Sequence, residues 1–157
     1  MSDLHEIYVL SEELAEVISA IGKGRRFGWN NKCPRTGESN LQHLIFEIHD
    51  VLGCCKMIGV DYIDNSCGVI TTVSSSTINR ALSNLVSVIS NTIAAVESYI
   101  VGSTNHSAFI SELKSCISSI MVICLAVVAI MGGDISINRV LIDNKIAKVK
   151  KLKHLVS

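Results

Sequence analysis

The chain has 157 residues, of which 48% are hydrophobic and only one is proline. Its 14 basic and 14 acidic residues cancel, so no overall charge favours nucleic acid or a membrane surface as partner. Length and composition predict one all-α domain, residues 1–157, with a sizeable core.

The first predicted helix covers about residues 3–21, where apolar residues recur at helical spacing. It carries Glu13 and Glu16, which are three positions apart and therefore share a face, beside Glu12. The glycine-rich, basic segment 22–38 is expected to be a loop, and long loops often carry function. Its candidate ligand-binding residues are Lys23, Arg26, Trp29 and Asn30.

The second predicted helix covers about residues 39–58. Ser39 followed by Gln42 fits a capping box. Glu47 and Asp50 again have the i, i+3 spacing, and they fall between an apolar stripe and a second stripe at Phe46, Gly53 and Met57. We therefore expect both carboxylates to be partly buried, which is unusual for surface charges.

The sequence pattern after residue 58 predicts three more helices, which gives a bundle of about five helices. Residues 59–75 look irregular, with an extended piece at 69–73. Two apolar helices follow within about 76–131; the first has a Ser/Asn face that could be an interface. The apolar run from Ile120 to Met131 is too short to span a bilayer, so a core helix is expected. The closing helix, about 136–155, is basic and carries Asn144, Lys145 and Lys148.

The cysteines and the start of the chain bear on location. Six cysteines form no C-x-x-C pair, and most fall in apolar helical stretches. Buried free thiols behave as small hydrophobic groups, so we expect neither a zinc site nor disulfides. No signal peptide is evident. These observations predict a cytoplasmic protein.

Two helices that each present a carboxylate pair would bring four negative groups together. Such an arrangement is costly unless a cation neutralises it. Oxygen ligands of this kind suit Mg²⁺, with Mn²⁺ as a substitute. The sequence therefore predicts a metal site whose ligands are Glu13, Glu16, Glu47 and Asp50. The alternative is two charged helix surfaces without a metal.

These motifs carry a resemblance to a known family. Glu12-Glu13-Leu14-Ala15-Glu16 followed by Glu47-Ile48-His49-Asp50 resembles the E-x-x-E and E-x-x-D signature of the all-α nucleoside triphosphate pyrophosphohydrolases. These are the MazG-like enzymes, with dimeric dUTPases and dCTP pyrophosphatases as relatives. The resemblance covers about residues 5–59 well and 136–155 loosely, and the basic turn at 23–28 is similar to that of phage members. Residues 60–132 match nothing in the family; they could be a degenerate second copy of the metal helices or an inserted hairpin for oligomerisation.

The resemblance implies an enzyme that cleaves a (d)NTP to the (d)NMP and pyrophosphate with Mg²⁺, assembled as a homodimer or homotetramer. Glu12, or one of the four ligands, would accept a proton from the attacking water. The residues that would contact phosphates or base are Lys145, Lys148, Asn144, Lys23, Arg26, Trp29 and Asn30. Trp29 could instead cap the core. The substrate stays open between dUTP, dCTP, dGTP, other NTPs and guanosine alarmones. The rival interpretations are a non-catalytic helical binding or regulatory protein and a small membrane-associated protein.

Overall fold

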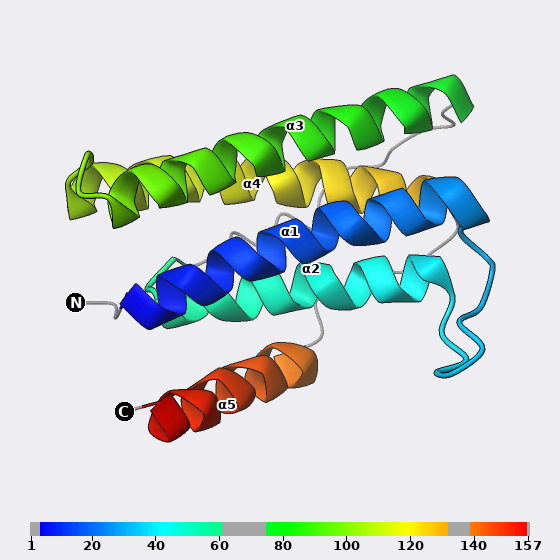
Figure 1. Ribbon diagram of the computed structural model, residues 1–157. Coiled ribbons are helices and arrows are strands. Elements are labelled where there is room, and N and C mark those ends of the chain that lie inside the picture. The colour runs from blue at the N-terminus through cyan, green and yellow to red at the C-terminus, as the bar shows by residue number, and fades with distance from the viewer. Residues whose placement is uncertain (1–3, 61–74, 132–138, 157) are drawn as a thin grey trace.

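The computed structural model describes residues 4–60, 75–131 and 139–156, and this part of the chain forms a bundle of five helices without a strand (Figure 1). The predicted all-α bundle is thereby confirmed. The helices are α1 (Leu4–Phe27), α2 (Asn40–Met57), α3 (Ser75–Ile100), α4 (His106–Ile130) and α5 (Arg139–Val156).

The pair α1 and α2 lies at the centre of the bundle and holds the predicted carboxylates. The two helices run antiparallel and contact each other along their length (Figure 1). The α3–α4 hairpin packs on α1 through α3, whereas α5 packs on α2. One hydrophobic core receives side chains from all five helices, among them Leu14, Leu44, Leu85, Leu113 and Ile142.

Helix α1 extends six residues beyond its predicted end, through Gly22 and Gly24 to Phe27. The prediction of a loop from residue 22 is therefore wrong up to residue 27. Tertiary contacts support this last stretch, because the Arg25 guanidinium donates hydrogen bonds to the Asn79 carbonyl (3.1 Å) and the Ser83 hydroxyl (3.0 Å) on α3. Gly28, with φ +87°, then ends the helix in the left-handed conformation that glycine adopts readily.

The other boundaries lie close to their predicted positions. Ser39 is the N-cap of α2, and Ser39 and Gln42 form the predicted capping box. The extended piece expected at 69–73 and residues 136–138 of the closing helix lie outside the described residues.

Helix α4 is the described helix that could cross a membrane by length and apolar composition, from His106 to Val128. A core helix of a soluble protein passes the same test, so this finding is weak evidence for a membrane. Phe109, Leu113 and Ile117 bury one face of α4 in the core that it shares with α3. Glu112 and Lys114 are exposed. Helix α4 thus has the one-sided burial of a bundle helix.

Candidate metal centre

Three carboxylates converge where α1 and α2 pack together. Glu13 from α1 and Glu47 and Asp50 from α2 each offer an oxygen atom, and these atoms lie within 4.8 Å of one another. Glu13 is only 8% exposed, while Glu47 and Asp50 are partly buried, as the sequence predicted. The helix spacing explains the pair on α2, because residues three apart lie on neighbouring positions of one face.

The other two predicted acidic residues, Glu12 and Glu16, are exposed on α1 and lie outside this cluster. Glu16 is nevertheless close enough for its charge to contribute to the raised pKa of Glu47. Glu12 likewise contributes to the raised pKa of Glu13. Three of the four predicted ligands therefore come together, with the fourth carboxylate nearby.

A lysine from α5 lies among the carboxylates. The Lys145 Nζ atom is 2.5 Å from Glu13 Oε1 and 3.0 Å from Asp50 Oδ2, and the residue is only 6% exposed. The sequence pattern predicted a phosphate contact for Lys145 and did not indicate these ion pairs. Its position was a usable signal, since it lies three residues after Ile142 and four before Val149, both of which are buried.

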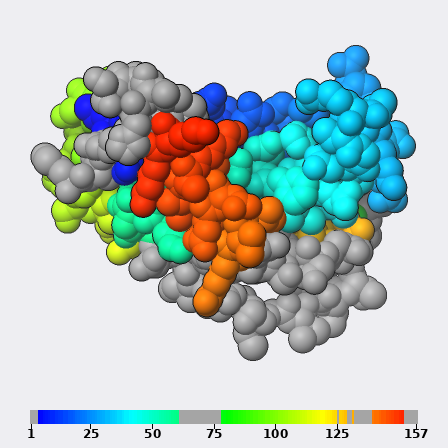
Figure 2. Space-filling model, turned by 90° about the horizontal axis from the view of Figure 1, so that it is seen from below, coloured from blue at the N-terminus to red at the C-terminus, as the bar shows by residue number. Residues whose placement is uncertain are grey.

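Gly53 is the reason that α5 can approach so closely. A Cβ atom added at Gly53 would lie 3.0 Å from Lys145 Cβ and 3.3 Å from the Ile142 carbonyl oxygen. An exposed ion pair between Lys56 and Asp143 (3.3 Å) also joins the two helices. Seen from below, α5 (orange to red) lies against α2 (cyan to green) (Figure 2). The second stripe of α2 thus contacts α5 at Gly53.

The cluster has more negative than positive charge. Burial, together with the negative charges of Asp50, Glu13 and Glu16, raises the pKa of Glu47 to about 7. Burial also raises the pKa of Glu13, although its hydrogen bond with Lys145 acts in the opposite direction. For Lys145, burial works against the charged form, but the hydrogen bonds to Glu13 and Asp50 raise its pKa overall. A divalent cation would relieve this excess, and carboxylate oxygens are the donors that Mg²⁺ and Mn²⁺ prefer.

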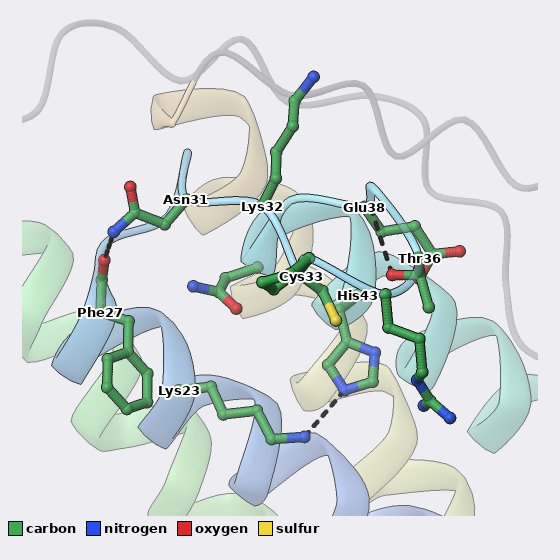
Figure 3. A pocket seen from close by; sticks show the side chains of 11 residues that line it. Lys23, Phe27, Asn31, Lys32, Cys33, Thr36, Glu38 and His43 are labelled. Carbon is green, nitrogen blue, oxygen red and sulfur yellow. Dashed lines mark hydrogen bonds between the residues drawn. The ribbon is translucent and has the colours of Figure 1, made fainter.

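A pocket of about 670 Å³ adjoins the cluster between the end of α1, the following loop and the start of α2 (Figure 3). It is lined by Lys23, Phe27, Asn31, Lys32, Cys33, Pro34, Arg35, Thr36, Glu38, Asn40 and His43. Lys23 and His43 point toward each other, with Nζ 3.4 Å from Nε2 (Figure 3). The other ring nitrogen of His43, Nδ1, is 3.5 Å from Glu47 Oε1.

His43 therefore connects the pocket to the carboxylates. A lysine ammonium only donates hydrogen bonds, so Nε2 of His43 is the acceptor available to Lys23, while Nδ1 faces Glu47. His43 was not among the residues predicted for the site. The signal was its position one helical turn before Glu47.

The remaining predicted ligand-binding residues lie elsewhere. Trp29 packs against Gly24 and the core, where a Cβ atom on Gly24 would lie 2.2 Å from the indole ring. Asn30 is exposed, and the Arg26 guanidinium lies 5.0 Å from the Phe27 ring centroid. The two other residues, Asn144 and Lys148, are exposed on α5. Of the predicted substrate-binding residues, Lys23 lines the pocket and Lys145 contacts the carboxylates.

His49 and the described cysteines lie outside the carboxylate cluster. His49 is buried, and its Nδ1 atom is 2.7 Å from the Ile45 carbonyl oxygen, as expected for a packed histidine. The five described cysteines are unpaired, while Cys67 lies outside the described residues.

No known protein family, curated protein or solved structure matches this chain. The functional interpretation therefore depends on the geometry and charge of the site itself.

Proposed function

We propose that the protein is a Mg²⁺-dependent nucleoside triphosphate pyrophosphohydrolase, which converts a (d)NTP into the (d)NMP and pyrophosphate. The observation that carries this proposal is the convergence of Glu13, Glu47 and Asp50 from two helices around Lys145 from a third. An acidic centre beside a basic group suits a metal-bound, negatively charged phosphate chain.

The acidic residues would divide the work. Glu13, Glu47 and Asp50 would hold Mg²⁺, which supplies charge neutralisation for the phosphate oxygens and orients a water molecule. The water oxygen would form a bond to the α-phosphorus as the bond from that phosphorus to the oxygen that bridges to the β-phosphate breaks. Pyrophosphate would then leave. Glu16 and Glu12, which are exposed on α1 one helical turn apart, are candidates for a further ligand and for the base that accepts the water's proton.

Lys145 would stabilise the phosphates. Its ammonium group compensates Glu13 and Asp50 in the structure described here. A divalent cation held by the carboxylates would supply that compensation, and the Lys145 ammonium group would then be available to a phosphate oxygen next to the centre. This role would place one permanently charged donor beside the metal without any change in the backbone of α5.

The alternative is a non-catalytic helical binding protein, and one observation favours it. Lys145 already satisfies Glu13 and Asp50 through two short ion pairs, so the cluster has a stable arrangement without metal. On this alternative, Lys145 serves to hold α5 on the α1–α2 pair. Of the three carboxylates, Glu47 would then be the one without an ion pair to Lys145, and its neighbour is His43.

Assembly, location and substrate complete the proposal. We propose a cytoplasmic homodimer or homotetramer, because the resembled family works in that form. The base of the nucleotide stays open between the candidates named above.

A panel of NTPs and dNTPs incubated with Mg²⁺ tests the proposal, with products identified by ³¹P NMR. The expected products are a nucleoside monophosphate and pyrophosphate, formed by the wild type and by Glu112→Gln, an exposed substitution on α4. Asp50→Asn should lose at least 100-fold in rate. Cleavage to a diphosphate and phosphate, or no cleavage of any nucleotide, would contradict the proposal.

A further inference from the structure

The pocket between α1 and α2 has the size and charge of an anion site. Its volume of about 670 Å³ falls within the range of small-molecule sites in proteins. Lys23, Lys32 and Arg35 contribute three positive charges, against one carboxylate from Glu38. Asn31, Thr36 and Asn40 add neutral hydrogen-bonding groups to the lining.

The loop that closes this pocket is tied down by backbone hydrogen bonds. The Cys33 amide donates to the Glu38 carbonyl oxygen (2.8 Å), and the Asn40 amide donates to the Asn31 carbonyl oxygen (3.0 Å). The Asn40 side chain also donates to the Gly28 carbonyl oxygen (2.7 Å). A pocket whose wall is held in this way can bind a ligand without a large ordering cost.

The pocket and the carboxylate centre share one wall. Lys23 contacts one side of the His43 ring, and Glu47 contacts the other. Lys32, by contrast, extends away from Lys23 and His43 at the rim (Figure 3). An extended anion that reaches Lys23 therefore lies one imidazole ring away from the carboxylates. A chain of phosphate groups has the charge and the elongated shape for this path.

We propose that this pocket binds the polyphosphate end of the ligand, so that the phosphate chain runs from Lys23 past His43 to the carboxylate centre. This inference deepens the proposed function and rests on it for the identity of the ligand. Lys23 and Arg35 provide the charge, since cationic donors form the strongest hydrogen bonds to phosphate. The nucleoside then lies outside the pocket, beyond the carboxylate centre.

Inorganic triphosphate is the probe, because it carries the phosphate chain without a nucleoside. Binding is measured by calorimetry in EDTA, which removes the metal and so separates the pocket from the metal centre. We expect one triphosphate per chain for the wild type, binding at least tenfold weaker for Lys23→Met and for Arg35→Met, and unchanged binding for Lys114→Met, an exposed substitution on α4. Fluorescence of Trp29, the single tryptophan, verifies that each variant keeps the folded loop.

The outcomes separate the pocket from the proposed function. Triphosphate binding that depends on Lys23, without cleavage of any nucleotide in Mg²⁺, supports the pocket and contradicts the pyrophosphohydrolase. Nucleotide cleavage with an unchanged KM in Lys23→Met supports the enzyme and overturns the pocket. Metal-free binding of a nucleoside such as uridine, with no binding of triphosphate, overturns it as well, because the pocket would then hold the other end of the ligand.

Discussion

Substitution of Glu47 by glutamine should have opposite effects on stability with and without metal. Glu47 is a largely buried carboxyl with like charges around it, and its pKa is raised from 4.5 to about 7. Glutamine keeps the shape of the side chain but cannot ionise. In EDTA at pH 8, Glu47→Gln should therefore be more stable than the wild type, whereas saturating Mg²⁺ should stabilise the wild type alone.

The magnitude follows from linkage between protonation and folding. Below pH 4.5 the carboxyl is protonated in both states, so it costs nothing. Between pH 4.5 and about 7 the unfolded chain releases this proton while the folded chain keeps it, and the stability of the wild type falls as pH rises. One pKa unit corresponds to about 1.4 kcal/mol, so a rise from 4.5 to about 7 sets an upper limit of about 3.5 kcal/mol on the cost at pH 8.

Urea unfolding at pH 4 and pH 8, in EDTA and in Mg²⁺, measures both effects. Wild type and Glu47→Gln should agree at pH 4 and differ by about 1 to 3 kcal/mol at pH 8 in EDTA, with the variant more stable. Glu112→Gln is the matched control, since that carboxylate is exposed on α4. Equal stabilities at both pH values, together with equal responses to Mg²⁺, would refute the reasoning for Glu47.

Three further substitutions test the packing around the centre. Gly53→Ala places a Cβ 3.0 Å from Lys145 Cβ, so we expect a loss of about 1–2 kcal/mol in urea unfolding and weaker Mg²⁺ binding; an unchanged stability would contradict the close approach of α5. Lys145→Met leaves buried carboxylates without their cation, so the free energy of unfolding should fall by about 3 kcal/mol at pH 8. Lowering the pH to 4 or adding Mg²⁺ should restore it, and a loss that does not depend on pH would contradict the ion pairs. Gly24→Ala should displace the Trp29 indole, with a red shift of its emission and a loss of about 2 kcal/mol. Gly22→Ala is its control, because nothing lies within 4 Å of that added Cβ and replacing a helical glycine should stabilise by about 0.5–1 kcal/mol.

Local patterns in the sequence were enough for most of the fold. Apolar periodicity and the Ser39 capping box placed the helices because both are properties of neighbouring residues. The C-terminal end of α1 was predicted too early, because two glycines and three basic residues within 22–26 are typical of a loop. The contact of Trp29 with Gly24 and the hydrogen bonds from Arg25 to α3 support that stretch, and neither is visible in local sequence.

The candidate site divides in the same way. The carboxylate pairs were found because i, i+3 spacing on a helix fixes which side chains are neighbours, and Glu13, Glu47 and Asp50 do converge. The ion pairs of Lys145 depend on how α5 docks at Gly53, and the pocket depends on the path of the loop after Phe27. Those arrangements come from tertiary packing, which a periodic pattern does not specify.

Direct measurement of Mn²⁺ binding by electron paramagnetic resonance tests the central claim, that Glu13, Glu47 and Asp50 form a divalent cation site. The wild type and Glu112→Gln should each bind one Mn²⁺ per chain, displaceable by Mg²⁺, whereas Asp50→Asn should lose at least tenfold in affinity. Two results would contradict this claim: no Mn²⁺ binding by the wild type at neutral pH, or the same Mn²⁺ affinity for the wild type and Asp50→Asn. In either case the carboxylates are not a metal site and Lys145 is their permanent partner.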